Sequence, residues 1–468
     1  MSEFHGKRVT VIGLGLHGGG SAAARYFASR GATVTVTDLR DESVLATSCE
    51  SLSDLDIRYV LGRHDTSDFE SADIVVKNPA VRRTSPYLAA AARIVTDISV
   101  FLDEFHGTVI AVTGTKGKST TASAIHHALK THTDNVFLGG NITVSPLSFI
   151  EETDENSTVV LELSSFQLGD LAYVAALSRR AVYAPHVALI TNIHVDHLDY
   201  YGSMESYVAD KRVVFASQSA THETIVRNDS YGAQFARETR ARVTVFGPEP
   251  AGDGAFLAPD GTGLLRRADS VETILPAKRK LPGEHNAENL LAAALAVHAV
   301  GMPRENAARA LAEFPGIEHR MEFCADLDRV AVFNDSAATI PEATLAAVSS
   351  FDRPVVLITG GNDKNLAYDA FTEIASRVSA VYLLDGTATP MIRDFFAERN
   401  PADAIHGPYS SLDNCVSDAV THAPENSIVL FSPGCTSFGM FANEFDRGRK
   451  FKRAVEEIAL AGRRRRPV

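Results

Sequence analysis

The 468-residue chain has little cysteine, no long apolar run and no excess of positive charge. Its four cysteines are far apart and form no C-x-x-C pair, which argues against a disulfide framework or a zinc knuckle and fits a reducing compartment. We expect all four thiols to be buried. No apolar run approaches the roughly 20 residues needed to cross a bilayer, and residues 1–7 have no secretory signal. These absences predict a cytoplasmic protein without membrane contact.

The formal net charge of -13 disfavours general nucleic-acid binding. The basic block Arg463 to Arg466 is interpreted as a solvated chain end rather than a recognition element. At a prior of about 100 to 200 residues per domain, the length predicts three domains. The composition, 45% hydrophobic and 22% charged, is ordinary for a globular protein with substantial cores.

Strand-like and helix-like patterns alternate along the chain, which predicts an α/β fold with parallel sheets. The expected strands cover 8–12, 33–37, 73–76, 109–113, 158–163, 187–191, 224–226, 243–246, 330–333, 354–359, 380–384 and 427–431. The expected helices include 18–30, 204–218, 286–300, 304–313 and 441–461. Glycine, proline and short alternating pieces between 247 and 282 predict a small β excursion. A Phe-Pro-Gly hinge begins at Phe314.

We predict an N-terminal Rossmann-like domain over 1–105, a central P-loop domain with a parallel sheet over 106–314 and a C-terminal Rossmann-like domain over 315–468. Ligands of such domains bind at the carboxyl ends of the strands and in the clefts between domains.

The most informative segment is Thr-Gly-Thr-Lys-Gly-Lys-Ser at residues 113–119, between an apolar run and a helical pattern. Gly114 and Gly117 let backbone N–H groups turn toward an anion. Lys118 supplies charge for the β and γ phosphates, and Ser119 can ligate Mg²⁺ at the helix N-terminus. Val112 stands where the general phosphate-loop pattern has glycine, so the shorter form T-G-T-x-G-K-[ST] applies. The segment predicts binding of ATP or GTP.

A second glycine loop follows the first expected strand. Gly13, Gly15 and Gly18 close that strand, and Asp38 ends the next one, where a carboxylate can hold a ribose hydroxyl. This spacing supports an NAD-dependent oxidoreductase as a rival interpretation, although it leaves the phosphate loop unexplained.

Acidic and imidazole side chains follow two strands near the phosphate loop. Glu162 ends an apolar strand, where a carboxylate can hold Mg²⁺, and a dense polar cluster with Gln167 follows it. His194, Asp196 and His197 follow the next strand. Their spacing does not supply the third or fourth close nitrogen or sulfur ligand that a zinc site needs, so we favour one histidine, His197, that assists a carboxylate-bound Mg²⁺.

Lys211 lies in a helical pattern, and chemistry alone predicts a solvated surface charge there. In the third domain, polar loops follow successive strands at 333–339, 360–364 and 432–437, and they suit an anionic ligand such as an amino acid carboxylate. His319 and Arg320, near the hinge, are placed to move toward a nucleotide when domains close.

Together these segments resemble the Mur ligases, ATP-dependent enzymes that add amino acids to the peptidoglycan precursor. The resemblance covers almost the whole chain. The matching motifs are Thr113-Gly-Thr-Lys-Gly-Lys-Ser119, Gly140-Asn141, Glu162-Leu-Ser-Ser-Phe-Gln167, Asp196-His197, Lys211, His285-Asn-Ala-Glu-Asn289 and His319-Arg320.

Within that family the chain is most similar to the branch that joins D-glutamate to UDP-N-acetylmuramoyl-L-alanine. The similarity to this branch lies in Gly13-Leu-Gly-Leu16, Asn334-Asp-Ser336, Lys364 and Ser432-Pro-x-Cys-x-Ser437. The chain departs from the residues usual in the branch at Ala337, Asn362 and Glu444. The resemblance implies an amide ligase that forms an acyl phosphate, uses ATP and two Mg²⁺ ions, and acts as a monomer. The first glycine loop would then hold a UDP diphosphate instead of NAD.

The resemblance also implies a role for each matched residue. ATP would be bound by Gly114, Thr115, Lys116, Gly117, Lys118, Ser119, Thr120, Asn289, Arg320 and Asp335. The metal ligands would be Ser119, Glu162, His197 and Lys211, the last as a carbamate. The UDP-sugar would be bound by Leu16, His17, Asp38, Asn141 and Gln167, and the amino acid by Thr339, Lys364 and Ser437. The expected catalytic residues are Lys118, Glu162, His197 and Lys211.

Three alternatives remain at this level. The chain could be a Mur ligase that adds L-alanine or a diamino acid, an NAD-dependent oxidoreductase, or a non-catalytic UDP-sugar sensor. The intact set of Lys118, Glu162, His197 and Lys211 argues against the sensor.

Overall fold

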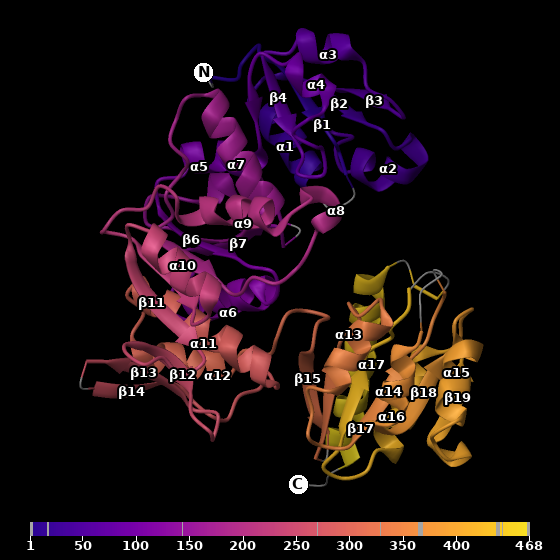
Figure 1. Cartoon of the computed structure of the whole chain (residues 1–468). Helices are drawn as coiled ribbons and strands as arrows, with labels where there is room; N and C mark the ends of the chain where they lie inside the picture. Colours follow the sequence, from indigo (N-terminus) through magenta and orange to yellow (C-terminus); the bar gives the residue numbers. More distant parts are fainter. Residues whose placement is uncertain are drawn as a thin grey trace. The chain divides into compact units, whose positions relative to one another are not determined.

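The computed structural model describes residues 3–15, 18–142, 144–268, 270–327, 329–363, 368–436, 440–441 and 443–465, without the side chains of 199 and 462–465. The chain forms two compact units. The first comprises Met1–Ala277 with Glu288–Leu311, and the second comprises Lys278–Ala287 with Ala312–Val468. Strands and helices alternate in both (Figure 1), which confirms the α/β fold class.

The first unit begins with a parallel sheet of order β3-β2-β1-β4-β5. Its elements are β1 (Arg8–Ile12), α1 (Gly19–Ser29), β2 (Thr33–Asp38), α2 (Glu42–Glu50), β3 (Ile57–Leu61), α3 (Thr66–Glu70), β4 (Ile74–Lys77), α4 (Pro86–Ala89), β5 (Ile94–Val95) and α5 (Asp97–Glu104). The strand order reverses between β1 and β4, and such a switch point opens a crevice at the carboxyl ends of the strands. The loops after β1 and β4 therefore meet at one binding edge.

The second sheet of this unit has the order β14-β13-β12-β11-β10-β9-β6-β8-β7. Its first half contains β6 (Thr108–Thr113), α6 (Lys118–Lys130), β7 (Val136–Gly140), η1 (Pro146–Ser148), η2 (Ile150–Glu152), β8 (Thr158–Glu162), α7 (Ser165–Leu177) and β9 (Val187–Ile190). Then follow α8 (Leu198–Tyr201), α9 (Met204–Arg212), η3 (Val213–Phe215), β10 (Glu223–Arg227), α10 (Ser230–Glu238) and β11 (Arg242–Gly247). The strands from β7 to β11 in the sheet are parallel, and β6, β8, β9 and β10 among them are largely buried.

The predicted β excursion is confirmed. β12 (Gly254–Leu257), β13 (Gly263–Arg267) and β14 (Ser270–Leu275) extend the sheet, and the pairs β12–β13 and β13–β14 are antiparallel. Two further helices follow, α11 (Glu284–Ala299) and α12 (Arg304–Ala312). One apolar core cluster joins both sheets of the first unit, from Val9 and Val34 through Phe101 to Val159 and Leu161.

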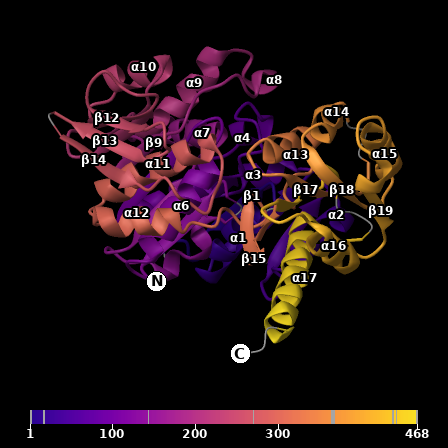
Figure 2. The same cartoon turned by 90° about the horizontal axis from the view of Figure 1, so that it is seen from below.

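The second unit has a sheet of order β15-β16-β20-β17-β18-β19, in which only the β15 pairing is antiparallel. Its strands are β15 (Glu322–Leu327), β16 (Val330–Asn334), β17 (Val355–Thr359), β18 (Val378–Leu384), β19 (Ile405–Tyr409) and β20 (Ile428–Phe431). Its helices are α13 (Pro341–Val348), α14 (Ala370–Ala375), α15 (Thr389–Ala397), η4 (Ala402–Ala404), α16 (Leu412–His422) and α17 (Glu444–Arg465). Figure 2 shows α17 along its length beside α16, and Phe451 of α17 stacks on Phe431 at 4.6 Å between ring centroids.

Some sequence expectations are corrected. The helix expected over 204–218 ends at Arg212 and continues as the short η3, and the last helix begins at Glu444 rather than at residue 441. All four thiols are free, but Cys49 and Cys324 are only half-buried. Strands β3, β5, β7, β15 and β19 were not predicted. No helix in the described part of the chain has the length and apolarity that a bilayer-spanning segment needs.

Candidate functional site

The phosphate loop joins β6 to α6, and its two glycines are required by the backbone. Gly114 has φ +140° and Gly117 has φ +82°. A Cβ at Gly114 would lie 2.0 Å from Oγ1 of Thr191, and one at Gly117 would lie 2.2 Å from Oδ1 of Asn289. The loop therefore closes tightly on the end of β9 and on α11, and Asn289 lies directly against it.

Residues that the sequence patterns did not reveal hold this loop in place. The Thr115 N–H donates to the Asn192 carbonyl at 2.9 Å, and the Lys116 N–H donates to Oδ1 of Asn192 at 2.9 Å. The Thr115 hydroxyl lies 3.0 Å from the hydroxyl of Tyr207 on α9. Lys118 curls back so that Nζ donates to the Thr115 carbonyl at 2.9 Å. The loop is thus preorganised around backbone donors at the start of α6.

Glu162 lies at the end of β8 with 1% of its surface exposed. Its Oε1 accepts a hydrogen bond from Nδ2 of Asn141 at 2.8 Å. Its Oε2 is buried and has no hydrogen-bond partner among the described residues. A buried carboxylate oxygen without a donor is costly unless a cation or another donor completes it, so this atom fits a Mg²⁺ ligand.

Lys211 is not a surface lysine, and that prediction was wrong. It is 2% exposed, and its Nζ donates to the Gly114 carbonyl at 2.7 Å. Burial, reinforced by the charge of Lys118, lowers the pKa of Lys211 to about 7. A substantial share of this amine is therefore neutral near neutral pH, which is the form that can react with carbon dioxide to give a carbamate.

His197 lies at the start of α8 in the left-handed region, with φ +52°. Its ring packs 5.0 Å from the Phe166 ring, between centroids, and its N–H donates to Oδ1 of Asp196 at 3.0 Å. His194 is exposed, and its N–H donates to the Thr115 hydroxyl at 3.0 Å. Across the described residues, no group of three His, Cys, Asp or Glu side chains is arranged to hold a metal ion. A metal here would need other ligands as well, such as Ser119, which is half-buried at the start of α6.

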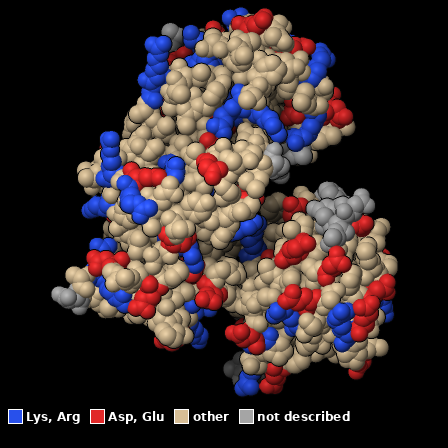
Figure 3. Space-filling model, in the orientation of Figure 1, with Lys and Arg blue, Asp and Glu red and all other residues tan. Residues whose placement is uncertain are grey.

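A pocket of about 680 Å³ lies where the loops of the first sheet face those of the second sheet. The expected residues Asp38, Asn141 and Gln167 line it. So do residues that sequence reasoning missed, namely Arg40, His64, Asn78, Asp97, Ser145, Phe166 and Tyr200. Leu16 and His17 lie outside the described residues. On the face drawn in Figure 3, Lys and Arg side chains curve around a hollow in the upper part of the first unit, which suits an anionic ligand.

Asp38 shapes the glycine loop. Its Oδ2 accepts a hydrogen bond from the Gly15 N–H at 3.1 Å, and its Oδ1 accepts one from the Arg40 N–H at 3.0 Å. Gly20 in α1 is also required, because a Cβ there would lie 2.3 Å from the Leu14 carbonyl oxygen. The loop thus delivers the N-terminus of α1 to the pocket, an arrangement that binds phosphates.

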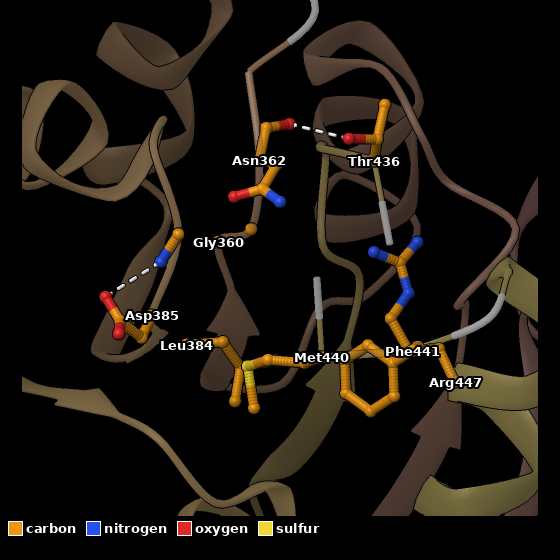
Figure 4. Close-up of a pocket in the computed structure, with 10 residues that line it drawn as sticks. Gly360, Asn362, Leu384, Asp385, Thr436, Met440, Phe441 and Arg447 are labelled. Carbon is orange, nitrogen blue, oxygen red and sulfur yellow. Dashed lines mark hydrogen bonds between the residues drawn. The ribbon is translucent and has the colours of Figure 1, made fainter. Parts of the chain in front are cut away.

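The second unit has its own pocket, of about 230 Å³, where the loops after β17, β18 and β20 meet (Figure 4). The Thr436 hydroxyl donates to the Asn362 carbonyl at 2.9 Å and ties two of these loops together. Lys364 and Ser437 lie outside the described residues. Thr339 is half-buried and is not among the residues that line this pocket.

Arg447 of α17 lines the same pocket and was not predicted. It is 1% exposed and donates to the Ser336 hydroxyl (3.0 Å), the Ser336 carbonyl (2.7 Å) and the Cys435 carbonyl (3.1 Å). All three acceptors are neutral, and burial lowers the pKa of Arg447 to about 10. The pocket therefore has a buried positive charge beside it.

Asp335, His319 and Arg320, which were expected near the nucleotide, differ in burial and in hydrogen bonding within the second unit. Asp335 accepts hydrogen bonds from the Met321 N–H at 3.1 Å and the Ser432 hydroxyl at 2.7 Å, and burial raises its pKa to about 7. His319 is 1% exposed and its Nδ1 lies 2.9 Å from Nδ2 of Asn334. Its ring is thus an interior group of this unit, whereas Arg320 is exposed.

Comparison with known proteins decides the family. A family model described as the Mur ligase middle domain matches residues 112–297, and one described as the Mur ligase MurD-like N-terminal domain matches residues 7–100. A protein of Roseiflexus sp. (strain RS-1) is 40% identical over 97% of this chain and 100% of its own. A protein of Treponema pallidum (strain Nichols) is 39% identical over 97% and 98%. Both are named UDP-N-acetylmuramoylalanine--D-glutamate ligase.

The chain belongs to the Mur ligase family. Solved structures of other Mur ligases share the fold at low sequence identity. MurC from Thermotoga maritima has a TM-score of 0.55 at 19% identity and covers 97% of this chain and 100% of its own. A MurF structure from Acinetobacter baumannii has a TM-score of 0.58 at 17% identity, over 84% and 93%.

Family membership confirms the resemblance drawn from the motifs, and this family is ATP-dependent. The rival NAD interpretation of the first glycine loop loses its support, because the family model over residues 7–100 describes a Mur ligase N-terminal domain. In this Mur ligase, the first unit brings Lys118, Glu162 and Lys211 to one phosphate loop and places Asp38, Asn141 and Gln167 on one pocket.

Proposed function

We propose that this protein joins D-glutamate to UDP-N-acetylmuramoyl-L-alanine and converts ATP to ADP and phosphate. The observation that carries this proposal is the meeting of three features at one sheet edge of the first unit. These are the phosphate loop, the buried Oε2 of Glu162, which has no hydrogen-bond partner in the described part of the chain, and the buried amine of Lys211. The names of relatives that match over nearly the whole chain support the choice of substrates.

The first glycine loop and the pocket beside it bind the UDP-sugar. The N-terminus of α1 faces the diphosphate, Asp38 holds the loop, and Asn141 and Gln167 lie toward the muramoyl end. Leu16 and His17, which lie outside the described residues, stay proposed contacts of the UDP-sugar. We propose three domains, each of which binds one ligand. The domain over 1–105 binds the UDP-sugar, the domain over 106–314 binds ATP, and the domain over 315–468 binds the amino acid.

The phosphate loop binds ATP through its backbone, Lys118 and the hydroxyls of Ser119 and Thr120. Asn289, which lies against Gly117, faces the nucleotide from α11, and Arg320 and Asp335 are further proposed contacts of ATP. Ser119, Glu162, His197 and Lys211 as a carbamate would hold two Mg²⁺ ions. When bound, these ions neutralise charge that gathers between the phosphates and the attacking carboxylate.

The chain's own groups then orient two anions that repel each other. Lys118 offsets the charge of the γ-phosphate while the substrate carboxylate oxygen attacks phosphorus and the bond to ADP breaks, which gives an acyl phosphate. The amine of D-glutamate attacks the acyl carbon and loses a proton, and the tetrahedral intermediate expels phosphate to leave the amide. No protein nucleophile is used, so positioning and exclusion of water supply the catalysis.

The amino acid site belongs to the second unit. Thr339, Lys364 and Ser437 are its proposed contacts, and the buried charge of Arg447 beside the pocket suits a dicarboxylate. A monomeric, cytoplasmic enzyme stays a prediction from the sequence.

The test is phosphate release from ATP by the full chain with UDP-N-acetylmuramoyl-L-alanine and a panel of L- and D-amino acids. We expect release with D-glutamate above all others. Preference for L-alanine or a diamino acid would contradict the substrate while leaving the family unchanged. Binding of UDP-sugar without any amino-acid-dependent release would favour the sensor.

A further inference from the structure

The loop after β4 reaches from the first sheet to the helices of the second through Arg83. Its guanidinium forms a two-pronged hydrogen bond with the carboxylate of Asp210 on α9 and donates to the Gly169 carbonyl at 3.3 Å. Its Nε lies 3.8 Å from Oδ1 of Asp170 on α7. Arg83 is separated from Asp210 by 127 positions in the sequence, so the fold alone creates this contact.

A second, fully buried ion pair lies at the same junction. Lys77, the last residue of β4, bonds to Oδ2 of Asp170, and the two side chains are 0% and 2% exposed. Gly169 leaves room for the network, because a Cβ there would lie 2.1 Å from Oδ2 of Asp210. Two buried acids and two basic side chains thus fix the loop after β4 to α7 and α9 at defined points.

The network reaches the side chains proposed to hold metal. Asp210 directly precedes Lys211, whose amine is bonded to the phosphate loop. The hydroxyl of Tyr201 on α8 donates to Oδ2 of Asp210 at 3.0 Å, and His197 is the residue that directly precedes α8. Arg82 adds a contact, since its guanidinium carbon lies 5.2 Å from the centroid of the Tyr200 ring. Arg82 thus contacts Tyr200 of α8 directly, whereas Arg83 is joined to Tyr201 through Asp210.

The same loop forms a wall of the UDP-sugar pocket. The pocket is lined by Asn78, Pro79, Ala80 and Val81 of this loop, and also by Tyr200 of α8. An occupant of the pocket therefore contacts the residues that directly precede Arg82 and Arg83, and it also contacts α8. No other residue in the described part of this loop makes a charged bond to α9.

We propose that Arg83 is a positioning residue that couples occupation of the UDP-sugar pocket to the ATP and metal side of the phosphate loop. A ligand that fixes the loop after β4 fixes Arg83, which fixes Asp210 and, through it, α8 and the turn of α9 that carries Lys211. This inference rests on the proposed function for the identity of the two ligands. It assigns Arg83 no contact with either of them.

The test measures binding, not turnover. The dissociation constant of the Mg²⁺ complex of a non-hydrolysable ATP analogue is determined on the full chain with and without saturating UDP-N-acetylmuramoyl-L-alanine. In the natural protein we expect the UDP-sugar to tighten analogue binding by about fivefold or more, the lower range of typical coupling between sites. Because coupling is reciprocal, the analogue must tighten UDP-sugar binding by the same factor.

The variants separate coupling from stability. Arg83→Gln should reduce the factor to near one, and Arg83→Lys, which keeps the charge without the fork, should retain part of it. Adding Arg83→Gln to Asp210→Asn should cause no further loss, since the two residues act as one unit. Arg30→Gln is the matched control, because Arg30 of α1 bonds to Glu151 in η2 and so joins the same two sheets without touching α8 or α9. It should keep the natural factor.

Three results would overturn the inference: no coupling in the natural protein, full coupling in Arg83→Gln, or equal loss in Arg30→Gln. If Arg83→Gln unfolds, Arg83→Lys and Asp210→Asn decide in its place. The proposed function is tested separately by phosphate release. A natural protein that shows coupling but releases no phosphate would contradict the proposed function alone, and one that releases phosphate without coupling would contradict the role of Arg83 alone.

Discussion

The amine of Lys211 lies 2.7 Å from the carbonyl oxygen of Gly114, so a lysine of α9 closes on the phosphate loop 97 positions earlier in the chain. The contact holds the amine away from water, and this burial, together with the charge of Lys118, lowers the pKa of Lys211 to about 7. It also places the amine beside Lys118 and Glu162, the two charged groups that the phosphate loop and β8 supply. A buried amine in this setting is the form that the proposed carbamate at Lys211 requires.

Lys118→Ala should lower ATP-dependent amide formation by at least about 10²-fold, because a preorganised charge at the phosphates is lost from the transition state. The measurement is phosphate release at saturating substrates, with circular dichroism to verify folding. Lys130→Ala, at the half-exposed far end of the same helix, is the control and should keep full activity. Normal activity in Lys118→Ala would contradict the proposed mechanism.

Lys211→Ala should be inactive whether or not carbon dioxide is supplied. Short carboxylic acids such as formate or acetate should restore part of its activity. The added carboxylate would occupy the space of the lost side chain and replace the carbamate oxygens. Phosphate release against acid concentration measures this rescue. Lys118→Ala should not respond to the same acids, and an equal response in both variants would show that the effect is not local to Lys211.

Gly117→Ala should weaken binding of the ATP analogue by more than tenfold and destabilise the first unit. The residue has φ +82°, and its Cβ would collide with Asn289 at 2.2 Å. Gly301 is a matched control with φ +90° and no atom within 4 Å of a Cβ. Gly301→Ala should therefore show only the backbone cost of about 1–2 kcal/mol, with normal nucleotide affinity. Calorimetric titration and thermal unfolding separate the two effects.

The pH dependence of stability should contain a contribution from Asp335. Its pKa rises from 3.8 to about 7 on burial. The native state therefore holds the proton more tightly than the unfolded chain, so the stabilisation is complete below pH 3.8 and is lost as the pH rises through 7. Relative to Asp335→Asn, the natural protein should lose stability between these values.

Scanning calorimetry of the full chain at several pH values tests this prediction. Asp403→Asn, at an exposed position of the same unit, is the control and should leave the pH slope unchanged. A natural protein that gains stability relative to Asp335→Asn as the pH rises would show that the sign is wrong.

Arg447→Met should destabilise the second unit by about 2–4 kcal/mol, because two carbonyls and a hydroxyl lose their donor. Removal of a buried charge relieves its desolvation cost and so offsets part of that loss. The substitution should also raise the KM for the amino acid more than it lowers kcat. Arg393→Met removes an exposed arginine with one bond to the Gly407 carbonyl at 3.0 Å and should change neither quantity. Urea unfolding and steady-state kinetics provide the two readouts.

The phosphate site could be predicted from the sequence because its residues are contiguous. The glycines, Lys118 and Ser119 lie together between a strand and a helix, and their conformations follow from local backbone chemistry. The β excursion was predictable for the same reason. By contrast, the partners of the loop, Asn192 and Tyr207, come from distant segments and carry no local signal.

The amino-acid sequence by itself determined the α/β class, the order of most strands along the chain, the phosphate loop and the family, because each depends on short apolar runs or on ordered motifs. The tertiary structure alone decided that Lys211 is buried, that Oε2 of Glu162 has no donor among the residues that the structure describes, and that Arg83 meets Asp210. Desolvation and charge pairing depend on which distant segments surround a group, and a helical lysine or a loop arginine looks the same in the sequence whether water or protein surrounds it.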